Sequence, residues 1–262
     1  MKINSFIVSL CVIFSINTFA AKKKIEYPWI KKHEANVYQK LPYRLLKPTA
    51  FNKQKKYPVI VYLHGGGGRG DDNLGQMNKT IAHLTKDEVR SEHPAYVLSP
   101  QSKSLWNKDQ LRKLKEIIES LENVDFDRIY LIGYSMGGHG IFRFLMEDHG
   151  YFTAAITVAG AGLKNTKPFI EPELLNDFPI WTFHGEKDTV SPYLKGKVLF
   201  EDFQKAGGIM KFTTYRGEGH KVPHAFFTQK ENQFTEFSSD KCDREKNALK
   251  WLFKQTKSTI KK

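Results

Sequence analysis

The segment that most constrains the fold of this chain runs from residue 128 to residue 138, with the letters RIYLIGYSMGG. An apolar, strand-like stretch leads directly into Ser135, which is the centre of a G-x-S-x-G pattern. Between a strand and a helix, such a serine occupies a sharp turn with its hydroxyl exposed at the end of the sheet. The small flanking residues let the strand and the helix approach closely. The segment therefore predicts an α/β fold with Ser135 as a nucleophile.

Strand-like and helix-like segments alternate through the rest of the chain. Short runs rich in apolar residues predict strands at 41–46, 57–63, 96–99, 128–132, 154–158, 180–183 and 211–215, and the run at 57–63 is the richest in β-branched residues. Apolar residues spaced on one helical face predict helices at 109–121, 137–147, 194–205 and 249–253. This alternation predicts one domain with a mostly parallel sheet between helices. In such sheets, ligand sites lie beyond the carboxyl ends of the strands.

A serine hydroxyl becomes a nucleophile at neutral pH only when a base takes its proton and an acid orients that base. The strand at 180–183 is followed by HGEKD at 184–188, and the last predicted strand is followed by GEGH at 217–220. Asp188 is predicted to orient the imidazole of His220, and His220 is predicted to be the general base. The chain order is serine, acid, histidine.

Both assignments have competitors. Glu186 and Asp177 are alternative acids, in which case Asp188 only caps the helix that follows it. His224 is the alternative base, four positions after His220. Asp188 is preferred because it lies in a loop that directly follows a strand, and His220 because glycines flank its loop.

Two further histidines precede a glycine at the end of a predicted strand. They are His64 and His184. Histidines in such positions are more often buried and hydrogen-bonded in the core than catalytic. We therefore predict a structural role for both.

The oxyanion that forms on an attacked carbonyl requires backbone N–H groups that already face it. The residue after the nucleophile normally supplies one, which predicts Met136. The segment LHGGGGRG at 63–70 follows a strand, and its glycines expose backbone amides without side-chain obstruction. We expect Gly66 to supply the second N–H, with Gly67 as the alternative. These glycines do not fit a nucleotide site, because no Gly-Lys-Ser/Thr sequence follows.

The chain is strongly basic, with a net charge of +13. Its lysines are spread along polar faces and both termini, without a recognition motif or an alternation of aromatic and basic residues. This distribution predicts a solvated surface and no nucleic-acid partner; adhesion to an acidic polysaccharide or an anionic membrane surface is the weaker alternative. No His, Cys, Asp or Glu spacing suggests a metal site, so none is expected.

Residues 1–21 have the composition of a secretory signal peptide. Lys2 supplies the positive charge, residues 6–14 the apolar core, and the letters TFAA at 18–21 a small-residue cleavage site. Residues 22–262 are then the catalytic domain, in which 22–39 form either an ordered arm or a loose tail. We expect a secreted or periplasmic protein without stable membrane insertion, because the apolar run is short for a spanning anchor.

The chain has two cysteines, and the first lies inside the signal-like segment. Lipid attachment at Cys11 is disfavoured, because the residues before it, Val8-Ser9-Leu10, lack the expected small residue. Removal of the segment leaves Cys242 as the single cysteine. No intrachain disulfide is therefore expected.

The chain resembles secreted bacterial α/β-hydrolases, a group of carboxylesterases, polyhydroxybutyrate depolymerase-like and feruloyl-esterase-like enzymes, and predicted peptidases related to prolyl oligopeptidases. The segments that carry the resemblance are LPYRLLKP (41–48), YPVIVYLHGGG (57–67), RGDDN (69–73), GYSMGG (133–138) and HGEKD (184–188). The likeness extends from Leu41 to Phe253. It implies the α/β-hydrolase fold and an acyl-enzyme mechanism without a cofactor. It also implies that Trp106 lines the substrate pocket, although a core position for this tryptophan is an equal alternative.

The resemblance implies an esterase that acts on a short ester or on an acyl group linked to carbohydrate. No large insertion separates residues 161 and 188, which favours an open cleft for a bulky or polymeric substrate. A serine peptidase of the prolyl-oligopeptidase type is the alternative, disfavoured because no propeller domain is recognisable. A binding protein that kept the fold without turnover is a second alternative.

Overall fold

The computed structural model describes residues 27–163, 168–222 and 225–260. The predicted signal segment at 1–21, Cys11 and His224 lie outside these residues. The strands are β1 (Glu34–Tyr38), β2 (Leu41–Leu46), β3 (Tyr57–Leu63), β4 (Tyr96–Pro100), β5 (Val124–Tyr134), β6 (Ala154–Val158), β7 (Ile180–Gly185), β8 (Met210–Tyr215) and β9 (Gln233–Phe237). The α-helices are α1 (Lys79–Leu84), α2 (Asp87–Glu92), α3 (Lys108–Glu119), α4 (Met136–Asp148), α5 (Tyr193–Lys205), α6 (Ala248–Lys254) and α7 (Lys257–Ile260). Short 3-10 helices are η1 (Pro28–Lys32), η2 (Gly66–Gly68), η3 (His149–Tyr151), η4 (Pro172–Leu175) and η5 (Ala225–Phe227).

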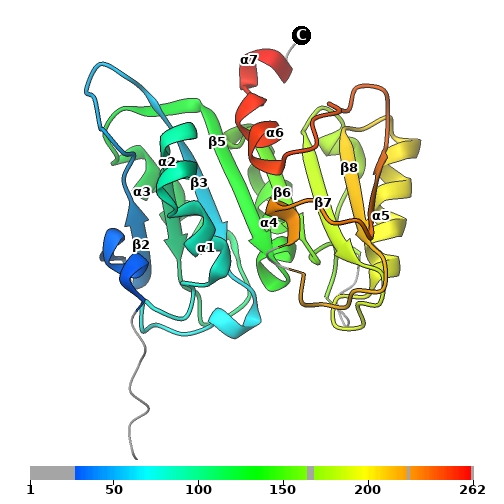
Figure 1. Ribbon diagram of the computed structural model, residues 1–262, viewed down its shortest axis with the longest axis horizontal. Coiled ribbons are helices and arrows are strands. Elements are labelled where there is room, and N and C mark those ends of the chain that lie inside the picture. The colour runs from blue at the N-terminus through cyan, green and yellow to red at the C-terminus, as the bar shows by residue number, and fades with distance from the viewer. Residues whose placement is uncertain (1–26, 164–167, 223–224, 261–262) are drawn as a thin grey trace, which may run out of the picture.

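All nine strands belong to one sheet, in the order β1-β2-β4-β3-β5-β6-β7-β8-β9 (Figure 1). The strands from β4 to β8 in this order pair in parallel. The pairs β1–β2, β2–β4 and β8–β9 are antiparallel. The predicted α/β-hydrolase architecture, a mostly parallel sheet flanked by helices, is confirmed.

Both faces of the sheet are covered, which explains the continuous apolar run of β3. Val59, Val61 and Leu63 pack into the core formed with α3, α4 and α5. Ile60 and Tyr62 point to the opposite core, which includes residues of α1 and α6. In Figure 1, α1, α2 and α6 lie on the near face of the sheet and α5 lies behind it. A strand that is buried on both faces has apolar residues at successive positions and does not alternate between apolar and polar residues, as expected for a parallel sheet.

The long elements lie where the sequence predicts them, and several short ones were not predicted. Residues 34–38 of the predicted arm form β1, an edge strand paired with β2. The strand β9 and the helices α1, α2 and α7 are also additional. Among the described residues, none of the helices combines the length and the apolar character required to cross a membrane.

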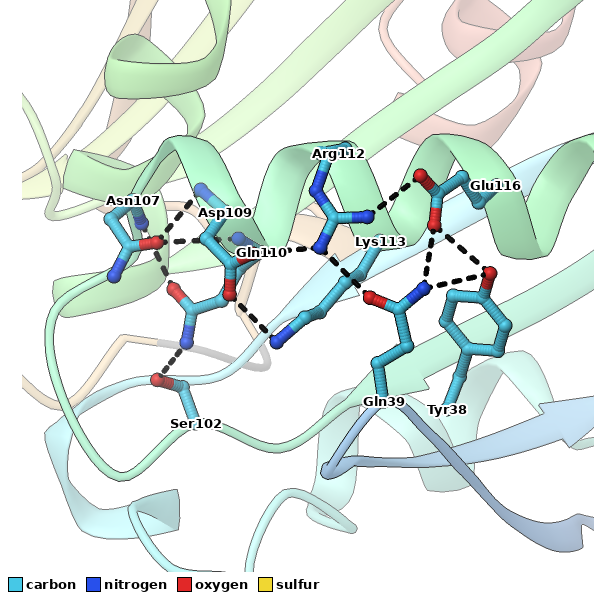
Figure 2. A network of polar contacts seen from close by, with 9 residues as sticks. All are labelled: Tyr38, Gln39, Ser102, Asn107, Asp109, Gln110, Arg112, Lys113 and Glu116. Carbon is cyan, nitrogen blue, oxygen red and sulfur yellow. Dashed lines mark hydrogen bonds and ion pairs between the residues drawn. The ribbon is translucent and has the colours of Figure 1, made fainter.

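Helix α3 is fixed at its start and along its exposed side by the polar network in Figure 2. Asn107 and Gln110 form a capping box that satisfies the first backbone N–H groups of the helix. Arg112 donates to the side chain of Gln39 at 2.8 Å, which joins α3 to the β1–β2 turn. The amide of Gln110 also donates to the hydroxyl of Ser102. The loop after β4 is thereby held against α3.

Candidate active site

Ser135 is the single residue between β5 and α4. Its backbone has φ 54° and ψ −115°, a conformation that residues with a side chain rarely adopt. Its N–H donates to the backbone oxygen of Val158 at 2.7 Å, which ties the turn to the end of β6. The structure therefore contains the strand–serine–helix arrangement that the sequence predicts.

Two glycines allow this turn to be tight. A Cβ at Gly137 would collide with the backbone oxygen of Leu63, at the end of β3. A Cβ at Gly133 would lie 2.6 Å from backbone atoms of Gly137. The first turn of α4 therefore rests directly on the carboxyl ends of β3 and β5.

The structure brings the three predicted triad side chains together. The Oγ of Ser135 lies 2.8 Å from Nε2 of His220, and Nδ1 of His220 lies 2.7 Å from Oδ2 of Asp188. Because a carboxylate only accepts hydrogen bonds, Nδ1 carries the proton and Nε2 is left to accept from the serine hydroxyl. The arrangement can therefore draw the proton from Ser135 towards an imidazole that a carboxylate orients.

Asp188 is buried and remains an anion. Its Oδ1 accepts from the backbone N–H groups of Val190 and Ser191 at 2.9 and 3.0 Å. Burial alone would favour the neutral acid. Hydrogen bonds from His184, His220 and the Ser191 backbone outweigh that effect and hold the pKa of Asp188 well below its usual value.

The competing acids make other contacts. Glu186 accepts a hydrogen bond from the backbone N–H of Gly217 at 3.0 Å. Asp177 forms an exposed ion pair with Lys241 at 3.4 Å. The carboxylate bonded to His220 in the described part of the chain is that of Asp188.

His64 and Trp106 pack together under the glycine loop. Nδ1 of His64 lies 2.7 Å from the backbone oxygen of Gly65, and its Nε2 accepts from the backbone N–H of Ser102 at 2.9 Å. Trp106 is 2% exposed, and its ring centroid lies 5.0 Å from that of His64. The core alternative accounts for these contacts of Trp106, and its contact with substrate stays a prediction.

The predicted oxyanion-hole residues begin two neighbouring helices. Met136 is the first residue of α4, so its N–H belongs to the groups that have no acceptor within a helix. Gly66 is the first residue of η2. A Cβ there would meet only the guanidinium of Arg69, at 3.5 Å, and a Cβ at Gly67 would meet nothing within 4 Å. Because Gly137 contacts the end of β3, the glycine-rich segment that follows β3 lies beside the start of α4. Met136 and Gly66 therefore remain the predicted backbone donors to the oxyanion.

Sequence reasoning missed the role of Tyr134 in holding the site. Its hydroxyl donates to the backbone oxygen of His220 at 3.0 Å, and a Cβ at Gly65 would lie 2.9 Å from its ring. Burial raises the pKa of Tyr134 to about 12, so the hydroxyl stays protonated. The signal in the sequence is the aromatic residue directly before the nucleophile.

His184 is fully buried, as predicted, but one of its contacts was not foreseen. Its Nε2 lies 2.8 Å from the backbone oxygen of Ser191 and 3.2 Å from Oδ2 of Asp188. The two histidines that approach Asp188 therefore come from β7 itself and from the loop after β8. The spacing of four residues between His184 and Asp188 is the only sequence signal for the contact.

An apolar cavity of about 260 Å³ lies beside the acid loop, the loop between β7 and α5 that carries Asp188, and is lined in part by Gly162, Phe169, Leu194 and Val198. The hydroxyl of Ser191 donates to the backbone oxygen of Gly162 at 2.8 Å, which joins the cavity wall to the loop of Asp188.

Among the residues that the structure describes, no three His, Cys, Asp or Glu side chains are placed to hold a metal ion.

Comparisons with known proteins identify relatives along most of this fold. Acyl-protein thioesterase 1 of Neurospora crassa is 30% identical over 51% of the chain and 52% of its own length. Dipeptidyl-peptidase 5 of Aspergillus fumigatus is 25% identical over 68% of the chain and 30% of its own length. The chain thus spans about half or less of these relatives.

The solved structure of a thermostable esterase aligns with a TM-score of 0.70 and 30% identity, covering 87% of this chain and 64% of that one. Residues 49–256, which include Ser135, Asp188 and His220, match the Dienelactone hydrolase family. This chain therefore belongs to the dienelactone hydrolase family of α/β-hydrolases.

Proposed function

We propose that this protein is a serine esterase that hydrolyses carboxylic esters through an acyl-enzyme. The observation that carries the proposal is the continuous hydrogen-bonded chain from Ser135 through His220 to Asp188, with distances of 2.8 and 2.7 Å. Family membership and the likeness to a thermostable esterase support it.

The reaction follows from this geometry in two halves. The Oγ of Ser135 attacks the ester carbonyl while its proton moves to Nε2 of His220, and the N–H groups of Met136 and Gly66 stabilise the oxyanion. The C–O bond to the alcohol then breaks, and the alcohol leaves with the proton from His220. A water molecule, deprotonated by the same imidazole, attacks the acyl-enzyme and releases the acid. Asp188 stays ionised throughout.

The first experiment treats the purified protein with a fluorophosphonate probe and locates the adduct by peptide mass spectrometry. We expect rapid labelling at Ser135 that is lost in His220→Ala, because only an activated serine reacts quickly. We also expect 4-nitrophenyl acetate hydrolysis to fall about 10⁴-fold or more in Ser135→Ala. A folded protein that neither labels nor turns over an ester would support a non-catalytic binding protein instead.

A peptidase activity is the second candidate, because part of the chain is similar to a dipeptidyl-peptidase. The same catalytic groups cleave amides when the site binds a peptide. Comparison of kcat/KM for 4-nitrophenyl esters and for dipeptidyl 4-nitroanilides separates the two functions. Faster turnover of the anilides would reverse the proposed order.

The natural substrate and the compartment are also proposals. The resemblance to feruloyl-esterase-like enzymes supports acyl groups linked to carbohydrate. The composition of residues 1–21 supports export. Comparison of the hydrolysis rates for acylated oligosaccharides and for simple alkyl esters tests the proposed substrate. N-terminal sequencing of the exported protein tests the proposed compartment.

A further inference from the structure

We propose that His184 is a positioning residue that holds the carboxylate of Asp188 in the orientation that His220 requires. The inference rests on the proposed triad. Its basis is that Nε2 of His184 contacts both Oδ2 of Asp188, at 3.2 Å, and the backbone oxygen of Ser191, at 2.8 Å. One ring therefore contacts both ends of the turn that carries the acid.

The partners of His184 fix the position of its proton. The carboxylate of Asp188 and the carbonyl of Ser191 can only accept hydrogen bonds, so Nε2 must be the protonated nitrogen. Nδ1 has no hydrogen-bond partner among the described residues. It faces Gly196 of α5, where a Cβ would lie 2.8 Å from it. His184 thus donates from Nε2 towards the loop that carries Asp188.

The ring has little freedom to leave this position. It is 0% exposed and lies between α5 and β8, with Tyr193 at 5.7 Å and Phe212 at 6.3 Å between ring centroids. The next residue, Gly185, lies so close to the loop before His220 that a Cβ would collide with the backbone oxygen of Gly219. The end of β7 therefore contacts the acid loop through His184 and the base loop through Gly185.

The contact matters because Asp188 serves His220 through one oxygen only. Oδ1 is held by two backbone N–H groups, and Oδ2 is shared between His220 and His184. Without His184, rotation of the carboxylate about its Cβ–Cγ bond is resisted at Oδ2 by the catalytic imidazole alone. The carboxylate would then be restrained at Oδ2 only by the imidazole that it has to orient.

Two substitutions separate positioning from packing. His184→Leu fills most of the space and removes the donor, whereas His184→Gln places an amide N–H near the position of Nε2. His33→Leu is the matched control, because it removes a buried histidine whose Nε2 lies 2.7 Å from Thr85 Oγ1, outside the proposed site. Thermal melting of each variant separates loss of fold from loss of function.

We expect His184→Leu to lower kcat for 4-nitrophenyl acetate about 10- to 100-fold with little change in KM, because small misplacements of catalytic groups have effects of this size. The acid limb of kcat/KM should move to lower pH, because a carboxylate that turns away from His220 stabilises the protonated imidazole less. His184→Gln should recover most of kcat and the original pH limb. His33→Leu should retain both.

A second readout does not depend on the substrate. The downfield proton resonance of the His220 Nδ1–H, bonded to Asp188, should shift or broaden in His184→Leu and return in His184→Gln. An unchanged resonance and pH limb in a folded His184→Leu protein would overturn the positioning role. If the wild-type protein hydrolyses no ester, the proposed function fails, and the resonance still decides whether His184 orders the carboxylate.

Discussion

The hydroxyl of Tyr134 donates a hydrogen bond to the backbone oxygen of His220, so the residue before the serine holds the loop of the base. The ring centroids of the two residues lie 5.3 Å apart. The same tyrosine ring packs against Gly65, in the loop that contains the predicted oxyanion donor. One side chain on β5 therefore contacts the two loops that flank Ser135.

Replacement of Tyr134 by phenylalanine should lower kcat about 2- to 10-fold and leave KM nearly unchanged. The change removes one neutral hydrogen bond, worth about 0.5 to 1.5 kcal/mol, while the ring contacts remain. Steady-state kinetics on 4-nitrophenyl acetate measure the effect. Tyr57→Phe is the control, because its hydroxyl accepts from the backbone of Asn52, away from the site. Equal losses in both variants would argue against a role for the Tyr134 hydroxyl.

Replacement of Gly66 by proline tests the second oxyanion donor. Gly66 is the first residue of η2, and Gly65 before it is extended with φ −76° and ψ 178°, a backbone that proline tolerates. Loss of the N–H should lower kcat about 10²- to 10³-fold without unfolding the protein.

Gly66→Ala is the matched variant, because it keeps the N–H and has room for a Cβ. We expect it to retain kcat within a few-fold. If the proline variant of a folded protein keeps full activity, the donor is not Gly66, and Gly67 becomes the candidate.

Replacement of Gly137 by alanine should destabilise the whole domain. The added Cβ would collide with the backbone oxygen of Leu63, which cannot move without shifting β3. We expect a loss of at least about 3 kcal/mol in the free energy of unfolding, measured by urea denaturation. In Gly150→Ala the nearest atom to the new Cβ is at 3.7 Å, so the loss there should stay within about 1 kcal/mol. Similar stabilities would show that α4 can move away from the sheet.

The stability of the protein should fall between pH 6.5 and 4. Burial, with Arg44 and Arg90 nearby, lowers the pKa of His33 from 6.5 to about 4. As the pH falls through this range, the unfolded chain takes up a proton at this histidine before the folded chain does. Each pH unit therefore removes up to about 1.4 kcal/mol of stability, and nothing is lost above pH 6.5.

Urea denaturation at pH 7, 5.5 and 4.5 measures this dependence. His33→Gln should show a smaller decrease than the wild type. Some decrease should remain, because burial also lowers the pKa of His139 to about 4. An identical pH dependence in the variant and the wild type would exclude His33 as a source.

The predictable part of the fold consists of elements with a strong periodic signal. Strands buried on both faces, such as β3, and the twelve-residue α3 are recognisable from their apolar pattern. The edge strand β9 has a partly exposed, polar sequence, and α1 and α2 span only six residues each. Such segments form because a neighbouring strand or core accepts them, which a local pattern does not report.

The candidate site also has a part that the sequence predicts and a part that it does not. Ser135, Asp188 and His220 each follow a strand of a parallel sheet, so their meeting at one edge is predictable, and the structure places them there. The contacts of Tyr134 and His184 depend on which strands are neighbours and on how far each loop folds back. These facts are set by the order of the strands, so sequence spacing alone could not reveal them.

The hydrogen bond between Ser135 and His220 joins residues 85 positions apart, across β6 and β7. Contacts of such long range form slowly, because the intervening chain must lose its freedom before the contact can stabilise anything. The half of the sheet from β5 to β8 must therefore be aligned before the two residues can meet. When the protein is diluted out of denaturant, the rate at which Ser135 regains its reactivity towards a fluorophosphonate probe therefore reports the rate at which this part of the sheet is completed.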